Sequence, residues 1–122
     1  MARLTIAQSI GAQSVIATSG TFGSLTATGG NPILAIPFSD LSGLLDTTTT
    51  DFVKWFSAIL LKYRLSLATD ATEDNGISIS TAIKQFTVFD GANVVGYAFD
   101  VTMYLPDNVT ALPDPDNIVA NV

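Results

Sequence analysis

The spacing of apolar residues changes in the middle of the chain. Over residues 52–60 they recur at intervals of three and four, which is the spacing of one face of a helix. Asp46 and the threonines after it offer N-cap oxygens, and Asp51 suits the first turn. The pattern therefore predicts one short helix, whose stripe we expect to pack into a core: Phe52, Trp55, Phe56, Ile59 and Leu60.

Beyond the helix the period becomes two, which is typical of strands with one buried face. The polar segment 70–76 ends in Asn-Gly and, like Asp90-Gly91, has the composition of a turn. A change of parity predicts a β-bulge near Lys84 and Gln85. These features predict a three-stranded antiparallel meander with strands over 61–67, 77–89 and 95–105. Its buried positions are expected to be Leu61, Tyr63, Leu65, Leu67, Val95, Tyr97, Phe99, Val101, Met103 and Leu105.

The two ends of the chain have a different composition. Residues 4–39 contain no ionisable side chain and are rich in Ala, Ser, Thr and Gly, whereas the C-terminal end repeats a Leu-Pro-Asp motif. Both features favour extended backbone that lies against other protein. We expect an α+β, β-rich chain in three parts: an extended N-terminal arm (1–45), a helix and antiparallel β core (46–106), and an extended tail (107–122). The predicted contacts with other subunits are Leu4, Ile6, Val15, Phe22, Val109, Ile118 and Val119.

Composition and charge narrow the function. Hydrophobic residues make up 48% of the 122 residues and charged residues 13%, which is enough to build a core. The net charge is −6, with five basic residues and none after Lys84, so we expect no binding to nucleic acid. The most apolar stretch is too short to span a bilayer, so we expect a soluble chain with no membrane partner.

The absence of His and Cys removes the commonest general base, cysteine nucleophiles, the Ser-His-Asp triad and the usual transition-metal ligands. Residues 70–76 resemble a calcium loop only superficially, because Asn75 and Thr81 stand where an EF-hand needs Gly and Glu. Asp90 and Asp100 form a possible carboxylate pair, yet no sugar groove accompanies them. We therefore expect no enzyme activity, no cofactor and no metal.

The uncharged arm, the small acidic β-rich core and the Pro-Asp tail together resemble the minor structural proteins of tailed-phage particles, with capsid decoration (cement) proteins as the nearest class. The resemblance lies in layout and composition. It implies a homo-oligomer on the virion surface that binds the capsid lattice and interlocks neighbours through its arms. Filament, tail and surface-layer subunits share this composition. A small ligand- or protein-binding module and a carboxylate enzyme are the alternatives from other functional classes.

Overall fold

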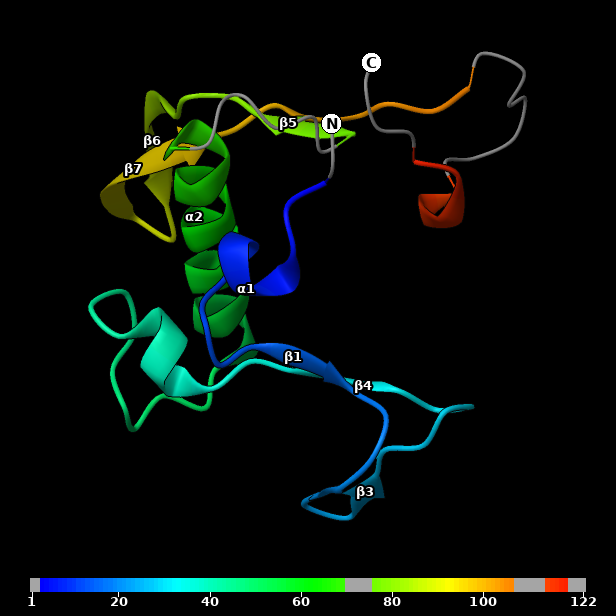
Figure 1. The fold of residues 1–122 in the computed structure, drawn as a ribbon. Helices are drawn as coiled ribbons and strands as arrows, with labels where there is room; N and C mark the ends of the chain where they lie inside the picture. The colour runs from blue at the N-terminus through cyan, green and yellow to red at the C-terminus, as the bar shows by residue number, and fades with distance from the viewer. Residues whose placement is uncertain (1–2, 70–75, 107–113, 119–122) are drawn as a thin grey trace. The chain divides into compact units, whose positions relative to one another are not determined.

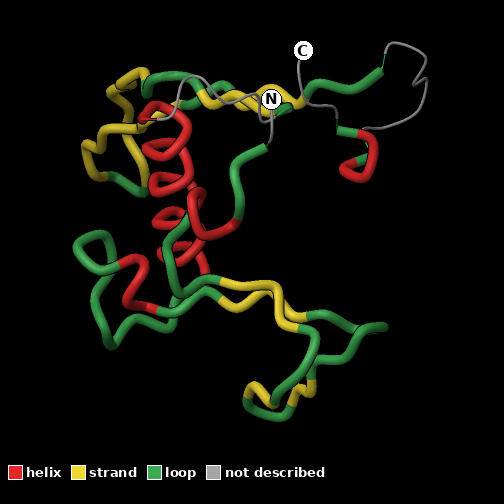
Figure 2. Tube along the Cα trace, viewed as in Figure 1, coloured by secondary structure: helices red, strands yellow, loops and turns green. Residues whose placement is uncertain are grey.

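The computed structural model describes residues 3–69, 76–106 and 114–118 (Figure 1). Contacts divide the chain into a helical unit, Leu4–Asp70, and a β unit formed by Ala71–Val122 with Met1–Arg3. The chain is mixed α+β, as expected. The predicted meander is wrong, because each sheet of the described residues is a two-stranded antiparallel pair (Figure 2).

The main helix, α2, spans Phe52–Thr69 and absorbs the segment predicted as the first strand. The strand prediction for 61–67 was wrong because its alternation also satisfies helical spacing: Tyr63 lies four residues after Ile59. Leu, Lys, Arg and Ala are good helix formers, and neither Gly nor Pro interrupts the segment. The Ser66 hydroxyl donates to the Ser9 carbonyl at 2.8 Å, which ties the second half of the helix to the N-terminal segment.

The helix α2 begins later than expected, because its cap is Asp51 and not Asp46 or one of the threonines that follow it. Asp51 caps the helix: its Oδ1 accepts from the Val53 N–H at 2.9 Å, and its carbonyl accepts from the Trp55 N–H at 3.1 Å. The Trp55 indole Nε1 donates to the Thr49 carbonyl at 2.9 Å. The indole thereby fixes the preceding loop against the first turn.

The N-terminal segment is folded rather than a separate arm. A capping box joins Thr5 and Gln8 and starts a single helical turn within the segment that was expected to be extended. Two short strand pairs follow, one nested within the other. The elements are α1 (Ile6–Ser9), β1 (Val15–Ala17), β2 (Thr21–Phe22), β3 (Leu25–Thr26), β4 (Ile33–Ala35) and the 3₁₀ helix η1 (Phe38–Leu41).

The core of the helical unit joins this segment to α2. Ile10, Leu41 and Ala58 are buried together, and Leu41 is fully enclosed. Partly buried side chains surround them: Ile6, Ile36, Leu45, Trp55, Ile59 and Tyr63. An arm independent of the helix is therefore ruled out for residues 4–45, because two of the three central core side chains come from that segment.

Asp40 organises the loop between α1 and β1. Its Oδ2 accepts from the Ser14 hydroxyl at 2.7 Å and from the Gln13 N–H at 3.1 Å. Ser14 is buried, so this bond satisfies a hydroxyl that water cannot reach. A methyl group at Gly11 would lie 2.6 Å from Cβ and Oδ1 of Asp40, so any larger residue would displace the carboxylate from its bonds to Gln13 and Ser14.

The β unit is built on one interrupted hairpin. β6 (Ile83–Phe89) pairs with β7 (Ala92–Ala98) without a bulge, so the predicted bulge near Lys84 and Gln85 is wrong. The interruption lies instead at residues 80–82 and 99–100, where the Asp100 carbonyl accepts from the Ser80 N–H at 2.9 Å. Beyond it the hairpin continues as β5 (Ile77–Ile79) paired with β8 (Val101–Met103). The third predicted strand is therefore broken in two.

The described end of the tail is a short 3₁₀ helix, η2 (Pro115–Asn117), capped by the Asp114 carboxylate. Arg3 donates from its guanidinium to the Ile118 carbonyl at 2.9 Å, which joins two segments far apart in the sequence within the β unit.

Candidate interaction surfaces

Most large apolar side chains of the β hairpin are exposed. The positions expected to form a buried face do not do so: Val95, Tyr97, Val101 and Met103 are all exposed. A sheet face is buried when a second layer of structure packs on it. Among the described residues of the β unit, no strand or helix beyond the hairpin's own strands supplies such a layer.

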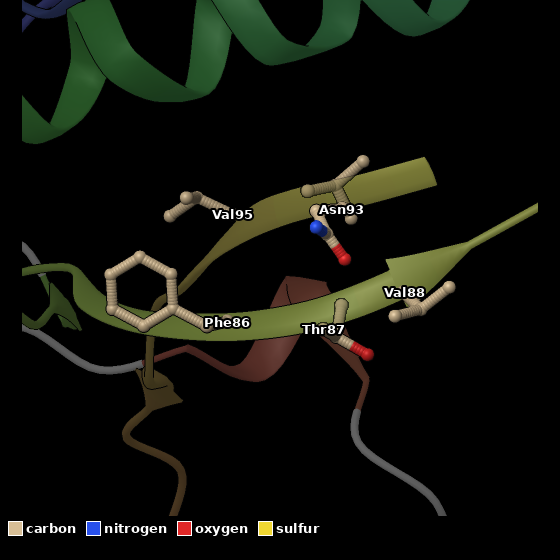
Figure 3. A pocket seen from close by; sticks show the side chains of 6 residues that line it. Phe86, Thr87, Val88, Asn93 and Val95 are labelled. Atoms are coloured by element: carbon tan, nitrogen blue, oxygen red, sulfur yellow. The ribbon is translucent and has the colours of Figure 1, made fainter. Parts of the chain in front are cut away.

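β6 and β7 present apolar side chains on both faces. Directly opposed residues of an antiparallel pair share a face, so Phe86 and Val95 lie together, as Figure 3 shows. Thr87 and Val94 lie on the other face. All seven residues of β6 are exposed, and Phe86 reaches 82%. The residues around a hollow at this hairpin are Phe86, Thr87, Val88, Asn93, Val94 and Val95.

α2 is apolar over most of its circumference, with only six polar residues among eighteen and no acidic one. A helix of this kind is normally surrounded by protein. Here one side packs on the core through Trp55 and Ile59, whereas Phe52 and Phe56 remain 76% and 55% exposed. The sequence prediction that the whole aromatic stripe is core was therefore wrong for these two rings, which contact each other with centroids 6.0 Å apart.

A third apolar surface runs along the β1–β4 pair. The residues that line its groove carry no charge: Gln13, Val15, Phe22, Ile33, Leu34, Ala35, Ile36 and Pro37. Such a groove has the lining of a site for an apolar ligand or peptide, with the Gln13 side chain as its polar member. Gln13 Oε1 already accepts from the Ser39 hydroxyl at 3.1 Å.

The predicted subunit contacts fall into three groups. Leu4 is buried and Ile6 packs against the core of the helical unit, so these two serve the chain's own fold. Val15 and Phe22 are exposed and lie in the β1–β4 groove. Ile118 is half-buried beside Arg3. Val109 and Val119 lie outside the described residues.

The sequence prediction missed the strongest exposed surface, on β6. The sequence did contain a sign of this surface. Both faces of the strand carry large apolar residues, whereas a sheet with one face in solvent normally has polar residues on that face. These residues are Ile83, Phe86, Val88 and Phe89.

The candidate carboxylates are not brought together. Asp90 lies in the turn before β7, with a positive φ of 51°, and Asp100 follows the end of that strand. Seven strand residues at about 3.3 Å each separate them by roughly 20 Å. No group of three acidic residues that could hold a metal occurs in the described part of the chain. The calcium-like segment 70–75 lies outside the described residues.

The pKa of Asp46 is lowered in the folded chain. Hydrogen bonds from the backbone N–H and the hydroxyl of Thr48, at 2.9 and 2.8 Å, hold the pKa of Asp46 below its ordinary value of 3.8. The nearby Lys54 adds a smaller effect in the same direction. The arrangement is a turn that leads into α2, and we assign it a structural role.

This turn predicts an acid-dependent loss of stability. A carboxyl whose pKa is lowered on folding stabilises the fold above its unfolded pKa, and the contribution is lost as pH falls through the folded value. Asp46→Asn should therefore reduce the free energy of unfolding near neutral pH, with the difference from the parent shrinking below about pH 4. Urea unfolding of both proteins at several pH values measures this difference. A gap that stayed constant down to about pH 2 would contradict the assignment.

Comparisons of the chain with protein-family models, curated proteins and solved structures found no match. No helix in the described ranges is long and apolar enough to cross a membrane.

Proposed function

We propose that this chain is a structural assembly protein whose exposed apolar surfaces are covered by other protein chains. The observation that carries the proposal is the exposure of β6 on both faces, with Phe86 and Phe89 at 82% and 74%. A two-stranded hairpin is at best marginally stable in water, and three or more strands or a packed helix are needed for independent stability. An exposed apolar patch of this kind marks a protein interface.

The specific form that we propose is a decoration or cement subunit of a tailed-phage capsid, present as a homo-oligomer on the virion surface. The uncharged N-terminal segment, the acidic balance and the Pro-Asp tail support this choice, although filament, tail and surface-layer subunits share them. The folded state of residues 4–41 changes how the subunit would work. Interlocking would use the exposed β surfaces rather than a free N-terminal arm.

The mass of the purified chain in solution tests the assembly proposal. Sedimentation velocity over a range of concentrations should give species at integer multiples of the chain mass. The apolar surfaces should also bind less of a hydrophobic dye as assembly increases, because burial removes them from water. A monomer at all concentrations that also fails to bind capsids would overturn the proposal.

The capsid assignment is tested on particles of a tailed phage whose genome encodes this chain. Mass spectrometry of purified particles should detect the protein, and electron microscopy should place it on the outer lattice in a fixed ratio to the capsid subunit. If the protein were found in the tail or in a filament instead, the assembly proposal would stand and the capsid assignment would be wrong.

The β1–β4 groove favours one further candidate function, a small binding module. Its lining is uncharged and largely apolar, and a module of this kind would work as a free monomer. A stable monomer that binds an apolar peptide in this groove would favour that function over assembly.

A further inference from the structure

We propose that the outer edge of β6 pairs with the same edge of a second copy, in an antiparallel register centred on Phe86. The inference rests on the proposed assembly function and specifies one of its interfaces. It would join two two-stranded ribbons into one four-stranded sheet, with the strand order β7–β6–β6–β7 across the two copies.

The backbone of β6 is open to such pairing. In the described part of the chain β6 has β7 as its strand neighbour on one side and none on the other. The strand is regular over seven residues, with no bulge and no proline. Proteins usually protect an exposed strand edge from pairing with a bulge, a proline, several charged residues or a covering segment. Lys84 is the one charged residue of β6.

The side chains of β6 are self-complementary in this register. A two-fold axis perpendicular to the sheet relates the two β6 strands, so each residue lies opposite the one equally far on the other side of the axis. When the axis passes at Phe86, all seven residues of β6 are paired. Ile83 then lies opposite Phe89, and Gln85 lies opposite Thr87. Each apolar residue on that face meets an apolar one, and each polar residue meets a polar one. On the other face Phe86 meets its own copy, and aromatic pairs across strands are favourable.

The charges also fit a second copy. Although the chain carries a net charge of −6, this register brings no two like charges opposite each other. Lys84 lies opposite Val88 and diagonal to Asp90 of the other copy, which is an attractive arrangement. Pairing through β7 is less favourable, because a full overlap centred on Val95 would place Asp90 next to Asp100 of the other copy at both ends.

A pair of charge variants tests the register. One chain carries Gln85→Lys with Thr87→Lys, and the other carries Gln85→Glu with Thr87→Glu. Since positions 85 and 87 face each other across the axis, each variant alone should dimerise at least about tenfold more weakly than the parent. An equimolar mixture should restore dimers as heterodimers. Sedimentation and native mass spectrometry distinguish the species.

Cysteine cross-linking gives a second measurement on an otherwise unchanged chain, which has no native cysteine. Phe86→Cys places two thiols at the axis, where the Cα separation in an antiparallel pair suits a disulfide. The matched control is Val95→Cys, on the same face of the same hairpin. Both variants are oxidised at a chain concentration high enough to offset the lost ring. The control thiols would lie three strand spacings apart, roughly 14 Å, so they should remain unlinked.

Heterodimers in the charge mixture and linkage at position 86 but not 95 support the inference. Linkage at 95 but not 86 overturns it in favour of the β7 edge. An oligomer that persists in both single charge variants and links at neither position overturns this interface while leaving the assembly function intact. A parent chain that is monomeric and does not bind capsids removes both.

Discussion

Replacing Leu41 by alanine is expected to destabilise the helical unit by about 2–5 kcal/mol. Leu41 is fully buried and lies at the centre of the cluster with Ile10 and Ala58. Alanine would leave a cavity between the N-terminal segment and α2, because the surrounding backbone can collapse only in part. The loss is large against the roughly 5–15 kcal/mol by which native domains are stable.

Leu44→Ala is the matched control for this measurement. Leu44 lies three residues after Leu41, beyond the end of η1, and is 46% exposed, so the same truncation removes less buried surface. Chemical unfolding followed by circular dichroism at the α-helical signal compares the variants, because α2 holds most of the helical residues in the described ranges. Equal losses in the two variants would show that Leu41 is not the centre of the core.

Replacing Phe86 by alanine is expected to weaken self-association by at least about thirtyfold, with little effect on the folding of the chain itself. The ring makes few contacts within the chain, since 82% of the side chain is exposed, and exposed substitutions usually change stability by less than about 0.5 kcal/mol. Aromatic residues at the centre of an interface commonly contribute 2 kcal/mol or more, which corresponds to that factor.

Thr87→Ala serves as the control, because Thr87 is the next residue on the opposite face of β6. Its effect on the dissociation constant should stay below about threefold. Sedimentation equilibrium measures association, and thermal melting at low concentration measures the stability of the chain alone. If Phe86→Ala lowered the melting temperature of the monomer and left association unchanged, the ring would belong to the chain's own fold.

The sequence predicted the features that depend on a few neighbouring residues. The Asp90-Gly91 turn and the antiparallel pairing of the strands on either side of it follow from local chemistry. The helix start was predicted to within a few residues: the cap is Asp51, which had been placed in the first turn. Caps and turns are decided by side chains within two or three positions of the backbone groups that they satisfy, so they can be recognised without a tertiary structure.

The sequence did not predict where α2 ends. Its second half reads equally well as a strand by alternation and as a helix by spacing of four. The bond from Ser66 to Ser9 and the packing of Tyr63 on the core favour the helix, and both involve residues far away in the sequence. Periodicity leaves such short apolar runs ambiguous, and tertiary contacts decide them.

The sequence also did not predict which apolar residues are buried and which are exposed. The apolar pattern placed Phe52 in the core and Leu41 in the extended arm, because it records hydrophobicity and not what faces each side chain. Only the tertiary structure encloses Leu41 and leaves Phe52 and Phe86 exposed. Burial depends on whether a second surface reaches the side chain. The sequence by itself thus determined an α+β chain rich in apolar surface, and the tertiary structure decided which part of that surface the chain covers itself.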